Sequence, residues 1–429
     1  MSRKLIKPAT PTPPHLRSCR ISALDQIALP IYVAFIQYYH VHGDDHDHDQ
    51  IRERLEKSLS EVLTLYYPLA GRYIRKNLLL DCNDEGVEYS EARVSGELAQ
   101  VLLQGEVKAE LLNLFVPFAM ESETTPLVLI QVNRFECGSL AIGLRIAHVV
   151  ADGIAMTTFF NAWATACRGA GVNEVIRPSF DLASFFPPRE ITVPLDLPPV
   201  DATKSKAFTT KRFVFNGTAI SRLKDIARGD ADDPTLPKRQ QYSRVVVVTA
   251  LMWKALIGVA QARDGGLRPS LACHPVNMRG RTALPIPDNS CGNFFSGANA
   301  RFSGESESKM ELHVLAGLVD GAIRNRVADC LKHQNVDDLV SFVTNSLREP
   351  GGERGDTNII MFSSWCRFPM YEADFGWGKP IWVSSTHKPA EIVTLMDTKD
   401  GKGIEVWVSL DEKDMLLFQK HPDIIAFTS

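Results

Sequence analysis

The sequence predicts an α/β protein with two domains. Its 429 residues exceed what one hydrophobic core usually holds, and chains of this length commonly divide. Strand-like and helix-like patterns occur in both halves. A proline-rich stretch at 184–205, in which no periodic pattern survives, separates the halves. We therefore expect a first domain at 1–183, a linker at 184–208 and a second domain at 209–429.

The composition is that of a globular protein with a large core. Hydrophobic residues make up 45% and charged residues 23%. Lys and Arg total 47 against 51 Asp and Glu, and this balance argues against a general nucleic-acid binder. The N-terminus lacks an apolar signal region, and no run approaches the ~20 apolar residues of a membrane span. We expect a soluble, cytoplasmic protein without nucleic-acid or membrane partners.

The cysteines and histidines do not indicate a metal centre. Eight cysteines are scattered and none forms a CxxC pair, which is typical of free thiols in a reducing compartment. The His-rich tract at 40–49 could bind a metal adventitiously. A solvated loop in front of the following helix is the better interpretation.

Several elements of the first half can be predicted. Apolar spacing indicates a helix at 51–65, ended by Tyr67-Pro68, and strands are expected at 78–81 and 87–94. Two further strands begin at Leu127 and are joined by a tight turn at 136–138. The second of these strands ends at His148. A helical apolar stripe begins after Gly153 and is closed by Gly169.

The second half contains three recognisable patterns. Residues 245–263 are interpreted as a strand running into a helix. A long amphipathic region covers roughly 306–347. Strands are expected near 357–364, 390–396 and 403–410.

The first chemical motif is the run His148-Val149-Val150-Ala151-Asp152-Gly153. A histidine at a strand end can point into a cleft, where a neutral imidazole with a pKa near ~6.5 can accept a proton. An HxxxD pattern alone is common, and a structural histidine is then the more frequent explanation. The strand-end position and the following glycine favour a functional role.

The second motif runs from Asp374 to Pro380 and alternates glycines with bulky aromatic residues. This alternation suits a tight, partly buried loop and implies no reaction by itself. A GxSxG elbow, a Walker A loop, an HExxH motif and a full GxGxxG fingerprint are all missing. Serine hydrolases, P-loop NTPases, zincins and Rossmann dehydrogenases therefore have no positive support.

The two motifs, in this order and at this separation, resemble the plant BAHD acyltransferase family. The resemblance covers essentially the whole chain. NAWATACRG, SSWCR and DFGWGKPIWV are most similar to its alkaloid acetyltransferase branch. Other family blocks occur in family order, at Tyr67–Arg72, Asp81–Gly86, Asn277–Arg281, Gly292-Asn293 and Ser363–Arg367.

The resemblance implies two chloramphenicol-acetyltransferase-like α/β domains joined by a crossover loop, with a channel between them. It also implies a monomer that uses acyl-CoA, most simply acetyl-CoA, as co-substrate and holds no permanent cofactor. His148 is then the general base for a small-molecule hydroxyl, and transfer needs no covalent acyl-enzyme. Trp365 and Ser363 are candidate donors to the tetrahedral oxyanion.

The remaining motif residues receive supporting roles from the resemblance. Asp152 is expected to turn away from His148 and pair with Arg279, although a charge partner for His148 is the alternative. Asp374, although counted with the catalytic set, is expected to hold its loop. Gly153, Gly376, Trp377 and Gly378 support the shape of the site.

Three functions share these motifs. The first is acetyl transfer to the hydroxyl of an alkaloid, a terpenoid or another specialised metabolite. The second uses a benzoyl, hydroxycinnamoyl or branched short-chain donor, or an amine acceptor. The third is a catalytically silent family member that acts as a binding protein, against which the intact His148, Asp152 and Asp374 count.

Overall fold

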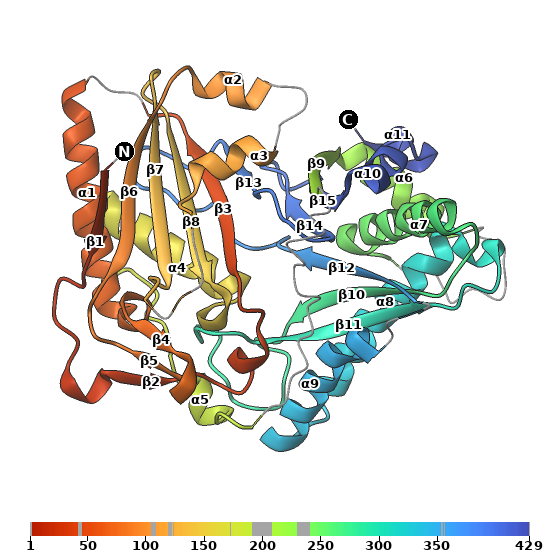
Figure 1. The fold of residues 1–429 in the computed structure, drawn as a ribbon, viewed down its shortest axis with the longest axis horizontal. Helices are drawn as coiled ribbons and strands as arrows, with labels where there is room; N and C mark the ends of the chain where they lie inside the picture. The colour runs from red at the N-terminus through yellow and green to blue at the C-terminus, as the bar shows by residue number, and fades with distance from the viewer. Residues whose placement is uncertain are drawn as a thin grey trace. The chain divides into compact units, whose positions relative to one another are not determined.

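The computed structural model describes residues 2–41, 45–103, 109–118, 122, 124–171, 173–190, 208–229, 241–352, 355 and 357–428. The chain divides into two compact units, and each is built around a six-stranded sheet. The first unit consists of 1–192, 285–294 and 368–386. The second consists of 193–284, 295–367 and 387–429. Figure 1 colours both by residue number.

The main sheet of the first unit is mixed. Only β6 and β7 run parallel among its paired strands, and the other pairs are antiparallel. A small separate sheet has the order β2 (Ser18–Arg20), β5 (Leu79–Asp81), β4 (Arg72–Ile74). The order of the main sheet is β1 (Ser2–Ile6), β6 (Val87–Val94), β7 (Val128–Phe135), β8 (Leu140–Ala147), β3 (Tyr32–Tyr39), β13 (Trp382–Ser384).

Helices cover both faces of this sheet. Because side chains alternate along a strand, Phe35 and Tyr38 of β3 point to opposite faces. Phe35 packs edge-on against Phe160 of α4 (Gly153–Thr165), at 5.1 Å between ring centroids. Tyr38 packs against Phe115 on the other face. The described residues of this unit also form α1 (Asp45–Leu65), α2 (Leu98–Leu103), α3 (Ala109–Leu112) and α5 (Leu182–Phe185).

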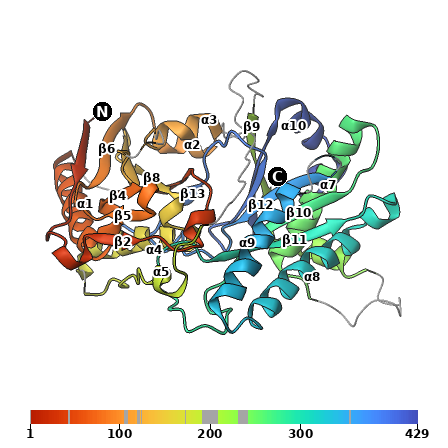
Figure 2. The same ribbon diagram turned by 60° about the horizontal axis from the view of Figure 1, so that its bottom comes forward.

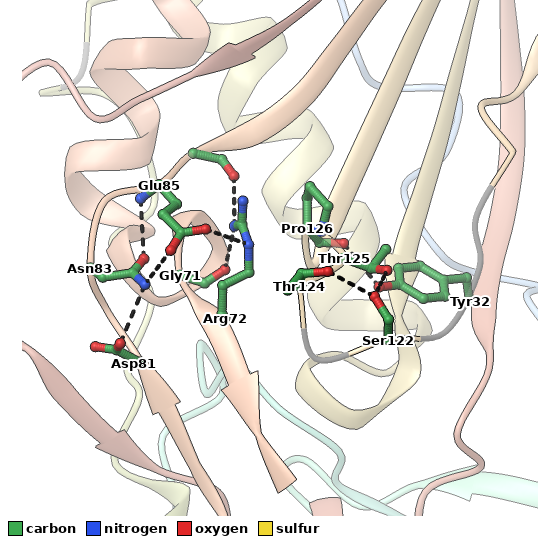
Figure 3. A network of polar contacts seen from close by, with 11 residues as sticks. Tyr32, Gly71, Arg72, Asp81, Asn83, Glu85, Ser122, Thr124, Thr125 and Pro126 are labelled. Atoms are coloured by element: carbon green, nitrogen blue, oxygen red, sulfur yellow. Dashed lines mark hydrogen bonds and ion pairs between the residues drawn. The ribbon is translucent and has the colours of Figure 1, made fainter.

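Two of the family-like blocks meet around a buried cation. Arg72 donates to the carbonyl oxygens of Gly71 and Gly86, at 2.8 and 3.0 Å, and pairs with Glu85 at 3.0 Å (Figure 3). Asn83 donates to Glu85 and keeps that carboxylate in place. These contacts satisfy a guanidinium that burial would otherwise penalise. The blocks at 67–72 and 81–86 therefore form one structural unit.

The second unit has a mixed sheet with a parallel centre. The strands β10, β12 and β14 run parallel, and the outer pairs are antiparallel. The order is β11 (Phe295–Phe302), β10 (Ser270–Asn277), β12 (Asn358–Ser364), β14 (Ile392–Asp397), β15 (Ile404–Asp411), β9 (Phe208–Phe215).

The helices of this unit also occupy both faces of their sheet (Figure 2). Trp253 of α7 (Arg244–Asp264) donates to Ser270 of β10 at 2.9 Å, within the apolar core. Asn299 of β11 donates to the Ser346 carbonyl of α9 (Val336–Gly352) on the opposite face. The other helices are α6 (Gly217–Ala227), α8 (Leu312–Cys330), α10 (Glu412–Phe418) and α11 (Pro422–Phe427).

The predicted strand at the start of 245–263 is wrong. The whole segment belongs to α7, whose first turn is capped by the Ser243 hydroxyl accepting from Val246 N–H. Core burial on most sides of the helix outweighs the β-propensity of the valine run. Within the described residues, α7 is also long and apolar enough to cross a membrane, but 72% of its apolar window is buried, as in a core helix.

The expected continuous domains differ from the structure. Segment 368–386, which carries the second motif, belongs to the first unit. The reason is strand pairing, since β13 extends the first sheet through an antiparallel register with β3. Segment 285–294 also joins the first unit. Most of the predicted linker, at 191–207, lies outside the described residues.

Two further predictions need adjustment. The amphipathic region at 306–347 contains two helices, α8 and α9, rather than one continuous element. The helix predicted from residue 51 begins at Asp45, so the second half of the His-rich tract is helical rather than a loop. Residues 42–44 of that tract lie outside the described residues.

Candidate active site

His148 lies at the end of β8, as its strand-end pattern predicted, and opens the short turn His148–Val150. Its backbone N–H donates to the Ile31 carbonyl at 2.8 Å. Its own carbonyl accepts from Asn293 Nδ2 at 2.6 Å. The peptide groups on both sides of the His148 Cα are therefore held, and the side chain leaves the sheet from a fixed point.

The surroundings of His148 favour the neutral imidazole. Burial is the largest influence and lowers the pKa of His148 below 6.5. A hydrogen bond to its own backbone, the charge of Asp152, a hydrogen bond with Asn293 and the charge of Asp25 act in the opposite direction. Since the net pKa stays lowered, a neutral ring is ready to accept a proton at neutral pH.

Asp152 forms the N-cap of α4. Its Oδ1 accepts from Ala155 N–H at 3.0 Å and its Oδ2 accepts from Phe294 N–H at 3.0 Å. Both oxygens thus bind backbone amides, one in the helix it caps and one in segment 285–294. This geometry favours the supporting role that the family resemblance assigns to Asp152.

Gly153 is required by close packing. A Cβ at this position would lie 2.3 Å from Cε2 of the Phe368 ring, well inside van der Waals contact. Phe368 belongs to the same inserted segment as the second motif. The glycine therefore lets that segment approach the first turn of α4.

Arg279, the expected partner of Asp152, belongs to the second unit. Its side chain is buried, and Nη1 donates to Asn277 Oδ1 at 3.1 Å. The pairing of Asp152 with Arg279 stays a prediction.

The second motif forms a loop closed on its own aspartate. Asp374 Oδ1 accepts from the N–H groups of Gly376 and Gly378, at 2.8 and 3.0 Å. Both glycines have φ near the left-handed range, at 103° and 102°, where other residues are strained. The contacts of Asp374 are therefore those of a loop-forming residue, and they do not support counting it among catalytic groups.

The aromatic residues of the motif anchor this loop. Phe375 is fully buried and meets Trp163 and Phe160 of α4, with ring centroids 4.9 and 5.5 Å away. Trp377 stacks on Phe375, at 5.5 Å and 10°. Arg54 of α1 donates to the Phe375 carbonyl at 3.0 Å. These contacts explain Trp377 by packing and place the loop against the helix that follows His148.

Ser363 and Trp365, the predicted oxyanion donors, lie at the end of β12 in the second unit. The Trp365 indole N–H donates to Ser363 Oγ at 3.0 Å. Indole has one N–H and no acceptor, so this donor is already used. Of the two groups, the Ser363 hydroxyl is the one that retains a proton to offer.

Sequence reasoning missed two polar residues beside His148 in the first unit and one beside Trp365 in the second. Asn293 belongs to a family-like block but received no role, and Asp25 carried no pattern at all. Lys388 places Nζ 5.0 Å from the Trp365 ring centroid and donates to Thr394 Oγ1 at 3.1 Å. Burial lowers the pKa of Lys388 to about 8. Their partners are distant in sequence, so only the fold could reveal them.

No group of three or more His, Cys, Asp or Glu side chains within the described ranges is arranged to hold a metal ion. The eight cysteines are free thiols, and all but Cys19 and Cys137 are buried.

Substitution of Asp374 tests its role in the loop. Asp374→Asn retains Oδ1 and should melt close to the parent. Asp374→Ala removes the acceptor of two N–H groups and should cost about 1–3 kcal/mol of unfolding free energy. Thermal melts of both variants provide the measurement. An alanine variant as stable as the parent, or an asparagine variant as unstable as the alanine one, would contradict the assignment.

The chain matches a family model described as Transferase family over residues 1–425. An acetyl-CoA-benzylalcohol acetyltransferase of Clarkia breweri is 41% identical over 438 residues, which cover 100% of this chain and 99% of that protein. Vinorine synthase of Rauvolfia serpentina is 34% identical over 427 residues, which cover 97% of this chain and 95% of that protein.

Solved structures agree with these relatives. The crystal structure of vinorine synthase superposes with a TM-score of 0.82 at 32% identity, covering 100% of this chain and 98% of that one. TRI101 of F. sporotrichioides, complexed with coenzyme A and T-2, matches with a TM-score of 0.73 over 96% of this chain and 99% of that one. At 19% identity, this second likeness shows the fold alone.

The family model, the relatives and the fold agree with the motifs, and they confirm the predicted two-domain α/β architecture. The chain belongs to the BAHD family and is an acyl-CoA-dependent acyltransferase.

Proposed function

We propose that this acyltransferase moves an acetyl group from acetyl-CoA to a hydroxyl of a specialised metabolite, with alkaloid and terpenoid alcohols among the acceptors. The relative at 41% identity names acetyl-CoA as its donor and benzyl alcohol as its acceptor. The likeness of NAWATACRG and SSWCR to the alkaloid branch supports the larger acceptors. Benzyl alcohol is therefore the first acceptor to assay.

One observation carries the proposal. His148 leaves β8 between two backbone hydrogen bonds, to Ile31 and from Asn293, and its pKa is lowered by burial. A fixed, neutral imidazole is what general-base catalysis on an alcohol requires.

The steps of the reaction can be derived from the chemistry of the His148 imidazole. An alcohol is a weak nucleophile at neutral pH, and His148 accepts its proton as the oxygen attacks the thioester carbonyl. The carbonyl π electrons move onto oxygen and form a tetrahedral oxyanion. When that oxyanion collapses, the C–S bond breaks and the CoA sulfur leaves with the electron pair. The imidazolium of His148 then returns the proton to that sulfur.

The oxyanion needs a fixed hydrogen-bond donor, typically worth ~3–4 kcal/mol. We infer that the Ser363 hydroxyl is this donor. The Trp365 N–H bond to Ser363 Oγ supports the inference, because a hydroxyl that accepts a hydrogen bond becomes a stronger donor. Lys388 lies over the Trp365 ring. When it is protonated, its charge strengthens the hydrogen bond that the Trp365 N–H donates to Ser363.

Other properties belong to the same proposal. The partners are one acyl-CoA and one small alcohol, without nucleic acid or membrane, and the enzyme is a cytoplasmic monomer without a resident metal. The free cysteines suit a reducing compartment. Benzoyl, hydroxycinnamoyl or branched donors, amine acceptors and a silent binding role remain the alternatives to test.

A transfer assay tests the proposed reaction and its base. Labelled acetyl-CoA should give labelled esters with benzyl alcohol or with an alkaloid or terpenoid alcohol, and less product with benzylamine or with benzoyl-CoA. His148→Ala should lose about 10²- to 10⁴-fold in turnover, because the base is gone. The matched control is His15→Ala, an exposed histidine, which should keep parental turnover. Near-parental turnover by His148→Ala would refute the mechanism.

The pH dependence of kcat/KM tests the protonation state of His148. A base must be neutral to act, and burial lowers the pKa of His148 below 6.5. Activity should therefore hold as pH falls through 6.5 and decline only below it. Initial rates from pH 4.5 to 9 supply the profile, with His15→Ala following the same curve. An acid limb centred at or above pH 6.5 would contradict the assignment.

A further inference from the structure

Asp25 is a buried carboxylate outside both sequence motifs. It begins the short turn Asp25–Ile27 and is 5% exposed. Its Oδ2 accepts from the N–H and the hydroxyl of Ser22, at 2.9 and 2.7 Å. Its Oδ1 accepts from the backbone N–H and the Nδ2 of Asn293, at 2.7 and 2.9 Å. Burial raises the pKa of Asp25 above 3.8, and the four donors act in the opposite direction by stabilising the carboxylate.

These contacts determine how the Asn293 amide is oriented. Nδ2 carries two protons, and it donates to Asp25 Oδ1 at 2.9 Å and to the His148 carbonyl at 2.6 Å. A carboxylate and a carbonyl cannot donate, so the reversed amide would face two acceptors with an oxygen. Oδ1 therefore points away from both.

The electrostatics point the same way. The charge of Asp25 raises the pKa of His148, which means that it stabilises the protonated ring. The charge of Asp25 acts on Cys19, Tyr73 and His148, and Asp152 is the other carboxylate acting on His148. Arg20 and Cys291 line the same hollow as Asp25. Cys19 and Tyr73 should stay protonated and uncharged near neutral pH, because burial raises the pKa of both side chains.

We propose that Asp25 is a positioning residue for His148: its carboxylate locks the Asn293 amide, and the locked amide holds the peptide of the base. This inference rests on the proposed role of His148 as general base. A purely structural anchor would tie Ser22 to Asn293 and leave the behaviour of the imidazole unchanged. Asp25 differs because it is a second acceptor without protons beside the His148 carbonyl, and because its charge acts on the imidazole.

Asp25→Asn is the direct test, because it preserves shape and removes the charge. Its new NH₂ must face donors from either Ser22 or Asn293, so one of these two contacts becomes repulsive and the hold on the Asn293 amide weakens. By analogy with carboxylates behind ligating histidines, turnover should fall about 10- to 100-fold. The acid limb of kcat/KM should move to lower pH, because a charge that raised the pKa of His148 has been removed.

Asp84→Asn is the matched control in the same unit. Asp84 accepts from the N–H and the hydroxyl of Thr12 and pairs with Arg17 at 3.4 Å. Its φ of 58° is one that asparagine adopts readily. This variant also loses one anchoring carboxylate, but it should keep the parental turnover and acid limb.

The outcomes separate this inference from the proposed function. An active His148→Ala enzyme refutes the function, whatever Asp25 does. If His148→Ala is inactive and Asp25→Asn keeps the parental turnover and acid limb, the Asp25 inference is overturned. A lower turnover with an unmoved acid limb also overturns it, because that result describes a structural anchor.

A chemical-rescue experiment covers an Asp25→Asn protein that does not fold. Asp25 borders a small hollow in the first unit, lined also by Cys19, Val150 and Gly292. Asp25→Ala enlarges this space by the volume of a carboxylate, so formate can enter. Turnover restored by sodium formate and not by sodium chloride supports the inference. No formate-dependent gain in turnover overturns it.

Discussion

The peptide of His148 is the point on which the chemistry of the first unit depends. Its N–H is bound by Ile31 at the start of β3, and its carbonyl is bound by Asn293 from segment 285–294. The sheet alone would leave a side chain at a strand end free to swing. Held on both sides, the backbone gives the imidazole a fixed point of attachment, and positioning of this kind is a large part of what an enzyme contributes to a bimolecular transfer.

The same constraint explains why distant segments belong to the first unit. Asp152 binds Phe294 N–H, Gly153 allows Phe368 to approach, and Phe375 fills the space between α4 and β3. Each contact joins the turn after β8 to segment 285–294 or 368–386. The two family motifs are therefore parts of one packed structure, in which the first carries the base and the second stabilises its surroundings.

Local sequence patterns predicted most helices and strands correctly. They did not predict features that depend on contacts between residues distant in sequence. The strand at 87–94 and the strand ending before His148 were recognised because one pattern and one turn define each. The valine run of α7 was misjudged, because core burial decided its conformation. The domain limits were misplaced because the pairing of β13 with β3 has no local signature.

The residues of the candidate site likewise fall into two groups, those recognisable from local motifs and those that only the folded structure reveals. His148 and the loop at 374–378 were recognisable from motifs, and a supporting role for Asp152 was expected from the family. Its bonds to the N–H groups of Ala155 and Phe294 were not predicted. Asp25 and Asn293 were missed because a carboxylate and an amide 268 positions apart in sequence meet only after folding. The commitment of the Trp365 N–H to Ser363 likewise required the geometry of the end of β12.

Direct transfer, without a covalent acyl-enzyme, is the central claim, and intact-protein mass spectrometry after incubation with acetyl-CoA alone tests it most directly. His148 acts on the acceptor hydroxyl, so no acetyl group should be bound to the protein before the alcohol is added. We predict an unchanged mass, followed by ester formation once benzyl alcohol is supplied. A stoichiometric acetyl adduct that the alcohol then discharges would show covalent catalysis and contradict the role given to His148.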